Sequence, residues 1–206
     1  MSRLVTAISL LLVSVTAAAA GGGPLFHYES DVGNKASVQR GAKNFMNYCS
    51  GCHSLKYLRY NRLAADNEIP EELLGNLMFT SSKPGEQIVS AMPADQAKVW
   101  FGQTPPDLSL TTRARGESWV YSFLKSFYLD PSKSTGVNNA QLPGASMPHL
   151  LGGVQGYQAI SHAEADQADA HGGGHSGPNF ELAVEGSLNE EEYDAFVADL
   201  VNFLAY

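Results

Sequence analysis

Cys49-Ser50-Gly51-Cys52-His53 is the stretch of the sequence that decides the fold. The spacing C-x-x-C-H is the attachment sequence of a c-type haem. Both thiols can add to the vinyl groups of one porphyrin, and the histidine beside the second cysteine presents a ring nitrogen to the iron as proximal ligand. We therefore expect Cys49 and Cys52 to attach one haem c covalently and His53 to bind its iron. A cofactor of this size would form the centre of the core.

Two other kinds of site share part of this spacing. A C-x-x-C dithiol can exchange disulfides, but the surrounding sequence lacks the βαβ pattern of such redox domains, and this function leaves His53 unexplained. A zinc site needs a second pair of ligands at a suitable spacing, and the chain has only two cysteines. The haem interpretation accounts for all three residues of the motif.

The chain has 206 residues, of which 44% are hydrophobic and 17% are charged, against roughly 25% charged in a typical soluble domain. Its formal net charge of −8 argues against a nucleic-acid binder, which needs a basic face. No Lys or Arg follows Lys133, whereas ten acidic residues do: Glu164, Asp166, Asp169, Glu181, Glu185, Glu190, Glu191, Glu192, Asp194 and Asp199. An acidic region of this kind suits a basic partner protein.

Residues 1–20 have the pattern of an export signal peptide. Arg3 is followed by an apolar run over residues 4–15 and by three alanines at 18–20 that offer a small-residue cleavage site. The run is shorter than the roughly 20 residues of a membrane-spanning helix. We expect cleavage near Ala20 or Gly21 and a folded domain over residues 21–206.

The clearest helix is expected over residues 187–206. Ser187 and Glu190 have the spacing of a capping box, and acids follow in the first turn, where the helix dipole favours them. Five of the ten acids belong to this helix and are expected on its solvated face. Its apolar face consists of residues at steps of three and four: Tyr193, Phe196, Val197, Leu200, Val201 and Leu204.

Further helical patterns run over residues 41–60, 70–74, 93–101 and 116–128, joined by long Pro- and Gly-containing loops. No segment alternates with a strand period for long, so the sequence predicts an all-α fold. Residues 161–178 are rich in Ala, Asp, Gly and His and are expected to form a flexible surface loop.

A second axial ligand to the iron must come from elsewhere in the chain. The candidates are Met46, Met78, Met92, Met147, His27, His149, His162, His171 and His175. Met46 is too near Cys49 in sequence to reach the opposite haem face, and His171 and His175 lie in the expected flexible loop. Met147 stands in an irregular segment, 143–148, whose Pro and Gly residues can hold a thioether inward. His149 is its main competitor.

Three segments together resemble the cytochrome c1 family, the haem c subunit of the cytochrome bc complex. The first, residues 49–55 (CSGCHSL), is followed by Tyr57 and by YNRL at 60–63. The second is TPPDLSL at 104–110, leading into RARG at 113–116, and the third is LPGASMP at 142–148. The haem motif occurs in many cytochromes, whereas the second segment is far more specific. The resemblance runs from about Gly23 to Tyr206.

The resemblance implies a class I cytochrome c-like haem domain, all-α with long loop insertions. It implies Met147 as the distal ligand and a haem lined by Pro106 and Leu108. It places Arg115 near a haem propionate, with Arg113 as the nearest competitor. An N-terminal helix is expected to cross the C-terminal one, with close approach at Gly41 and the contact filled by Phe45 and Phe196.

The function implied is one-electron relay from the Rieske iron–sulfur protein to a soluble cytochrome c, in a complex with cytochrome b. The expected location is the periplasmic face of the inner membrane, or the equivalent intermembrane side. Family members usually continue from the last helix into a membrane anchor, which this sequence lacks, so we expect a truncated or incomplete sequence. The alternatives for membrane attachment are that the signal segment serves as an anchor or that the complex holds the domain. The alternative is a free-standing periplasmic monohaem carrier, or a cytochrome subunit of another dehydrogenase.

Overall fold

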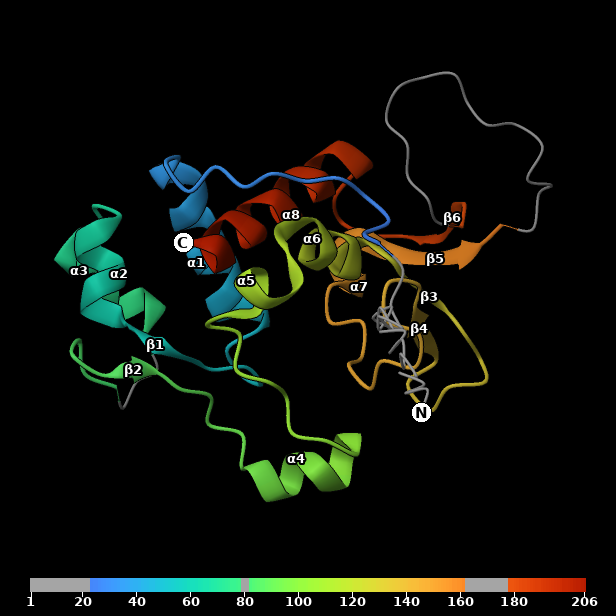
Figure 1. Ribbon diagram of the computed structural model, residues 1–206, viewed down its shortest axis with the longest axis horizontal. Coiled ribbons are helices and arrows are strands. Elements are labelled where there is room, and N and C mark those ends of the chain that lie inside the picture. Colours follow the sequence, from blue (N-terminus) through green and yellow to red (C-terminus); the bar gives the residue numbers. More distant parts are fainter. Residues whose placement is uncertain (1–22, 79–81, 162–177) are drawn as a thin grey trace, which may run out of the picture.

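The computed structural model describes residues 23–78, 82–161 and 178–206 (Figure 1). The expected signal peptide at 1–20 lies outside these residues, and so does the expected loop at 161–178 apart from its two end residues. The helices are α1 (Lys35–Tyr48), α2 (Tyr60–Asp66), α3 (Glu71–Leu74), the 3₁₀ turn η1 (Gly75–Leu77), α4 (Ala94–Phe101), α5 (Thr111–Arg115), α6 (Glu117–Lys125), α7 (Gly152–Gln155) and α8 (Glu190–Ala205). The strands are β1 (Leu55–Arg59), β2 (Gln87–Ile88), β3 (Phe127–Leu129), β4 (Val137–Asn139), β5 (Gly156–Ile160) and β6 (Phe180–Glu185).

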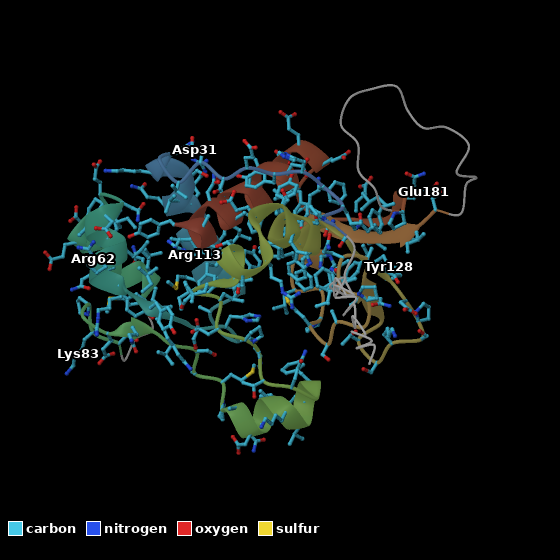
Figure 2. The ribbon with its side chains drawn as sticks, in the orientation of Figure 1. Asp31, Arg62, Lys83, Arg113, Tyr128 and Glu181 are labelled. Atoms are coloured by element: carbon cyan, nitrogen blue, oxygen red, sulfur yellow. The ribbon has the colours of Figure 1, made fainter. Side chains whose placement is uncertain are left out.

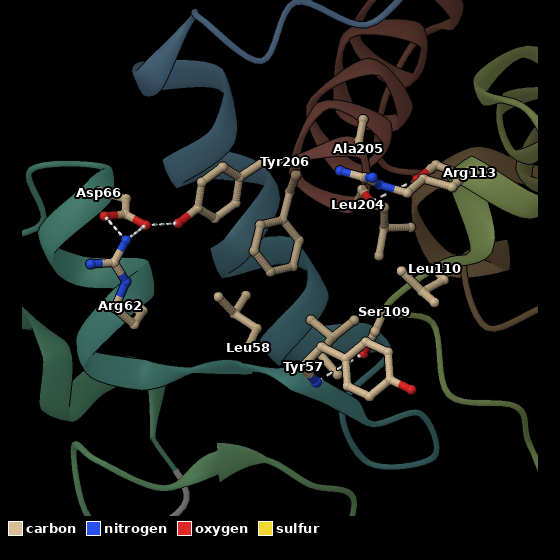
Figure 3. A pocket seen from close by; sticks show the side chains of 13 residues that line it. Tyr57, Leu58, Arg62, Asp66, Ser109, Leu110, Arg113, Leu204, Ala205 and Tyr206 are labelled. Atoms are coloured by element: carbon tan, nitrogen blue, oxygen red, sulfur yellow. Dashed lines mark hydrogen bonds and ion pairs between the residues drawn. The ribbon is translucent and has the colours of Figure 1, made fainter.

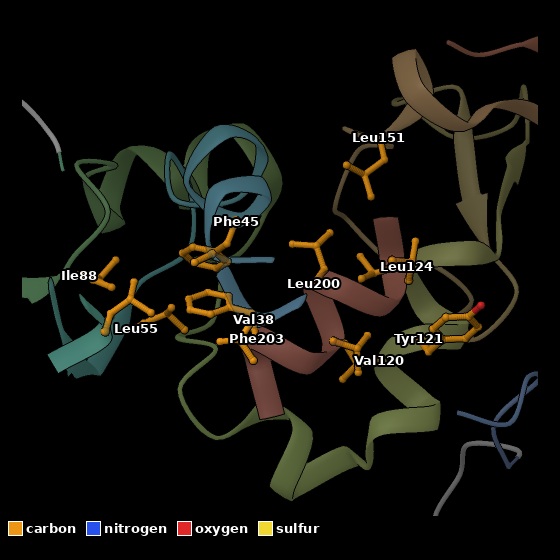
Figure 4. Packing of buried hydrophobic residues seen from close by; sticks show 14 of the residues in the cluster. Val38, Phe45, Leu55, Ile88, Val120, Tyr121, Leu124, Leu151, Leu200 and Phe203 are labelled. Carbon is orange, nitrogen blue, oxygen red and sulfur yellow. The ribbon is translucent and has the colours of Figure 1, made fainter. Parts of the chain in front are cut away.

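The core is built around the crossing of α1 and α8, as the family resemblance implied (Figure 4). A Cβ atom on Gly41 would lie 1.9 Å from the carbonyl oxygen of Asp199, so only glycine allows this approach. Phe45 is fully buried and packs on Phe203, with ring centroids 5.5 Å apart. Phe196 instead meets the edge of Tyr48 at 5.5 Å. The close approach at Gly41 is confirmed, and Phe203 is the partner that the sequence analysis missed.

A buried carboxylate, that of Asp199, stabilises the crossing of α1 and α8. Asp199 is only 8% exposed, and its two carboxylate oxygens accept hydrogen bonds from Arg40 Nε and Nη2, each at 2.7 Å. Ser37 Oγ donates to the same carboxylate at 2.6 Å and accepts from Asn202 Nδ2 at 2.8 Å. The expectation that Asp199 lies on the solvated face of the helix was therefore wrong, because α1 covers it.

The first turn of α8 is capped two residues later than the sequence pattern suggested. Asn189 Oδ1 accepts from the backbone N–H of Glu192, and Glu192 Oε2 accepts from the backbone N–H of Asn189, both at 2.9 Å. This is a reciprocal capping box. Ser187 lies before the cap, because the side chain of Asn189 takes that role. The backbone N–H of Ser187 donates to the carbonyl of Gly153 in α7 at 3.1 Å.

The all-α prediction is only partly confirmed. Within the described residues the strands form three two-stranded antiparallel sheets, β1–β2, β3–β4 and β5–β6. Residues 55–59 were expected to continue a helix, but Leu55 pairs with Ile88 and both are buried, so tertiary packing overrides the local helical pattern. The helix expected over 116–128 ends at Lys125 and is followed by β3. The helices expected at 70–74 and 93–101 are present as α3 and α4.

No helix in the described part of the chain is both long enough and apolar enough to cross a bilayer.

Candidate functional site

A cavity of about 100 Å³ lies where the cysteine–histidine motif faces two loops from later in the chain. Four of the residues singled out in the sequence line it: Cys52, His53, Pro106 and Met147. The rest of its lining is largely apolar and comes from the end of α4 and from both loops: Phe101, Gln103, Pro105, Ser146, Pro148 and Leu150. Segments distant in sequence thus meet at a single cavity.

The motif lies on the turn that follows α1. Cys49 is the C-terminal cap of this helix, and its backbone N–H donates to the Phe45 carbonyl at 2.8 Å. The Cys49 carbonyl then accepts from the backbone N–H groups of Cys52 at 3.0 Å and His53 at 2.8 Å. These bonds close a compact turn, so the packing of α1 against α8 fixes the position of the motif.

Both cysteines have raised pKa values. Burial, and secondarily the charge of Cys52, raise the pKa of Cys49 to about 12. Burial also raises the pKa of Cys52. Thiol–disulfide enzymes need the opposite shift, because the thiolate is the attacking species. The site therefore disfavours the disulfide-exchange alternative.

His53 is oriented by a backbone carbonyl. Its Nδ1 lies 2.8 Å from the carbonyl oxygen of Pro106, so Nδ1 carries the proton and the lone pair is on Nε2, the usual arrangement of a histidine that binds a metal. Burial lowers the pKa of His53, while the Pro106 carbonyl and the Asp107 carboxylate oppose that shift. The ring is therefore held neutral, the form in which imidazole binds a metal.

Met147 reaches the cavity from an irregular loop. Gly144 adopts φ +80°, which favours glycine, and the backbone N–H of Ala145 donates to the Leu142 carbonyl at 3.1 Å. The resulting turn directs the chain so that Ser146, Met147 and Pro148 all line the cavity.

His149, the competing ligand, lies outside the cavity lining. Its ring stacks on Phe127 with centroids 4.9 Å apart and meets the edge of Tyr157 at 5.6 Å. Its Nε2 lies 3.2 Å from the Gly156 carbonyl oxygen. The remaining described candidates, Met46, Met78, Met92 and His27, do not line the cavity either. His162, His171 and His175 lie outside the described residues.

Three other residues expected near the cofactor do not line the cavity. Leu108 packs against the core, and its backbone N–H donates to the Ser54 carbonyl at 2.9 Å. Arg115 is exposed at the end of α5, with its guanidinium carbon 4.9 Å from the ring centroid of Trp119. Arg113 lines a different pocket of about 320 Å³, between α2 and the end of α8 (Figure 3).

Aromatic rings link α6 to the segment that carries Met147. Trp119 stacks on Phe123 at 5.4 Å, and Phe123 meets the edge of Phe127 at 5.2 Å. Phe127 in turn stacks on His149. The rings of Trp119 and Phe123 in α6 thus pack on one another and connect through Phe127 to His149, two residues after Met147.

The family model described as the Cytochrome C1 family matches residues 26–171. The chain belongs to the cytochrome c1 family. Its whole length is 49% identical, over 210 residues, to cytochrome c1 from Allochromatium vinosum, of which it covers 84%. It is 39% identical over 176 residues to a protein named ammonia monooxygenase gamma subunit from Nitrosomonas europaea, covering 85% of this chain and 70% of that protein. It is 27% identical over 158 residues to the protein named cytochrome c1-2, heme protein, mitochondrial, from Solanum tuberosum. That match covers 63% of this chain and 60% of that protein.

Cytochrome c1 proteins carry one covalently bound haem c. The residues at the cavity fit that group. Cys52 and the neighbouring Cys49 offer thiols, His53 a neutral imidazole and Met147 a thioether, within largely apolar walls. Each is a donor type that haem proteins use.

The roles of several residues that line the cavity were not predicted from the sequence: Phe101, Gln103, Pro105, Ser146, Pro148 and Leu150. Phe101 and Gln103 flank Gly102, whose φ of +76° ends α4 and turns the chain toward the cavity. A helix stop of this type is visible in the sequence, but the direction in which the chain continues is not.

Proposed function

We propose that this cytochrome c1 is the haem-bearing subunit of a cytochrome bc1 complex and relays one electron from the Rieske iron–sulfur protein to a soluble cytochrome c. The observation that carries the proposal is that His53 and Met147, from segments far apart in sequence, line the same cavity. The similarity to cytochrome c1 over the whole chain supports it.

The chain's own residues hold the cofactor. We propose that Cys49 and Cys52 attach it through thioether bonds. Nε2 of His53 is the proximal ligand and the sulfur of Met147 the distal ligand. When bound, haem c supplies a one-electron carrier, and a His–Met ligand pair gives it a higher potential than two histidines would. The Pro106 carbonyl keeps the imidazole in the tautomer required.

Arg115 and Leu108 are assigned supporting roles. The Arg115 guanidinium carbon lies 4.9 Å from the ring centroid of Trp119, and a guanidinium can donate two N–H groups to a haem propionate. Leu108 contributes an apolar side chain to the haem surroundings, next to Pro106. Both roles follow from the family and are proposals here.

The distribution of charge favours a basic electron acceptor. Arg62 and Lys83 lie at one end of the molecule and Glu181 at the other (Figure 2). Glu181 and Glu185 are exposed on β6, and Glu190 and Glu191 on the first turn of α8. An acidic end of this kind attracts a basic cytochrome c and raises the encounter rate at low salt.

We further propose that residues 1–20 direct export and that the domain acts at the periplasmic face of the inner membrane, or the equivalent intermembrane side. Its partners there are cytochrome b and the Rieske protein. Attachment to the membrane occurs through the complex or through an anchor segment.

Purification from native membranes tests the proposal. We expect the chain to co-purify with cytochrome b and the Rieske subunit and to give a covalent haem stain on a denaturing gel. Addition of quinol to the complex should reduce its haem, and a Rieske inhibitor should prevent that reduction. A chain that purifies alone with its haem would instead be a free-standing carrier, and a chain without covalent haem would contradict the proposal entirely.

A further inference from the structure

We propose that Asn138 and Asn139, at the end of β4, are positioning residues that hold the loop carrying Met147 against the cavity. The inference rests on the proposed role of Met147 as the distal ligand. Both asparagines are buried, with 8% and 0% exposure respectively. Their side chains bond to backbone groups of the turn that precedes Met147.

Asn139 fixes the start of that turn. Its Oδ1 accepts from the backbone N–H of Leu142 at 2.9 Å and from Ser126 Oγ at 3.2 Å. Its Nδ2 donates to the carbonyl oxygen of Phe123 at 2.8 Å. One amide group therefore ties the loop to the end of α6.

Asn138 fixes the other side of the turn. Its Oδ1 accepts from the backbone N–H of Gly144 at 2.8 Å and from the backbone N–H of Asn139 at 2.9 Å. Its Nδ2 donates to Asp130 Oδ2 at 3.0 Å, and that bond orients the amide so that its oxygen faces Gly144. Gly144 has a positive φ and lies three residues before Met147, and its backbone N–H is thus held by Asn138 Oδ1.

These bonds matter for an axial ligand because a thioether binds ferric haem iron weakly and competes with other ligands. A loop held at Leu142 and Gly144 keeps the sulfur near the iron after each dissociation. Loss of either asparagine leaves a backbone N–H of the turn, that of Leu142 or Gly144, without its side-chain acceptor and gives the loop other conformations. The Met147–iron bond is then easier to displace.

The experiment is a titration of the ferric holoprotein with imidazole, which competes with methionine for the iron. The readout is the weak absorption near the red edge of the visible spectrum that reports methionine–iron coordination. Asn138→Leu and Asn139→Leu should each bind imidazole about tenfold more tightly, the change expected for one lost hydrogen bond. The matched control is Asn67→Leu, since Asn67 is 2% exposed and its side chain bonds to the Leu63 carbonyl of α2 and to Tyr206, neither of which belongs to the loop that carries Met147. Its imidazole affinity should stay within about twofold of wild type.

Exchanging the carboxylate of Asp130 and the amide of Asn138 changes the imidazole affinity in a way that a general loss of stability would not. Asn138→Asp places a carboxylate against Asp130 and should tighten imidazole binding. Asp130→Asn combined with Asn138→Asp restores the donor–acceptor pair in reverse and should return the affinity to the wild-type value. If the leucine variants fail to fold, the comparison of Asn138→Asp with the double variant tests the inference by itself. Failure of the double variant to recover would overturn the inference, as would wild-type affinity in every variant.

The result also separates this inference from the proposed function. If Met147→Leu keeps the red-edge band, the ligand assignment itself is wrong. If Met147→Leu loses the band while the asparagine variants behave as wild type, Met147 is the ligand and the positioning role is wrong.

Discussion

Nδ1 of His53 lies 2.8 Å from the carbonyl oxygen of Pro106, so the turn after α1 and the loop before α5 are joined at the proposed iron ligand. The α1 side of this contact is fixed by the crossing with α8. The Pro106 side is held by the bond from the Leu108 N–H to the Ser54 carbonyl. The stability of the helix crossing and the geometry of the ligand are therefore linked.

Gly41→Ala tests the crossing. A Cβ atom would lie 1.9 Å from the Asp199 carbonyl oxygen and 2.7 Å from Cβ of Phe203, so the helices must move apart. We expect the free energy of unfolding to fall by about 3 kcal/mol, measured by denaturant titration of the holoprotein. Gly75→Ala is the control, because Gly75 has φ −56° and nothing within 4 Å of its added Cβ. Equal stability of the two variants would contradict the close approach.

Asp199→Ala tests how much the buried Asp199 carboxylate stabilises the crossing of α1 and α8. The change removes the acceptor of Arg40 and Ser37 and should cost about 2 kcal/mol, less than a fully buried pair because the Arg40 side chain is 60% exposed. Glu191→Gln on the exposed side of α8 should cost below about 1 kcal/mol. Thermal unfolding of both variants checks the ranking, and the reverse order would show that Asp199 is solvated.

The helix crossing could be predicted because it depends on residue type at short spacing, with Gly41 on an apolar helical face. Cys49, Cys52 and His53 form one local motif that predicts haem attachment, and this assignment stays a proposal. The capping box was misplaced because two pairs, Ser187–Glu190 and Asn189–Glu192, satisfy similar patterns. The structure excludes the first pair because α8 begins at Glu190, directly after Asn189, whose side chain caps it.

The strands and most of the cavity lining could not be predicted, because they depend on contacts between distant segments. Leu55 becomes part of a strand only through pairing with Ile88. The local Pro and Gly residues favour Met147 as a ligand over His149. That the His149 ring lies outside the cavity lining depends on its stacking on Phe127, a residue distant in sequence. Neither contact is visible in a local sequence pattern.

Substitution of the cysteines tests the covalent attachment. Cys49→Ser with Cys52→Ser should eliminate the covalent haem stain on a denaturing gel, while either single variant should keep one thioether and a weaker stain. Ser50→Ala is a control within the same turn. A double variant that still carries covalent haem would show that the attachment lies elsewhere.

The exposed acids of β6 test the steering of a basic acceptor. Glu181→Gln combined with Glu185→Gln should slow electron transfer to a basic soluble cytochrome c by about two- to threefold at low ionic strength, because the attraction between the partners weakens. The difference should disappear at about 1 M salt, where screening is nearly complete. Stopped-flow oxidation of the reduced protein measures both rates. A difference that persists at high salt would indicate a local structural effect instead of steering.

The ferric absorption spectrum of the holoprotein and of its Met147→Leu variant tests the central claim most directly. We expect the red-edge methionine–iron band in the wild-type protein, in Met92→Leu and in His149→Gln, and its complete loss in Met147→Leu. The same variant should have a lower reduction potential, because methionine ligation raises it. A band that survives in Met147→Leu, or that disappears in His149→Gln while the protein remains folded, would contradict the proposed site.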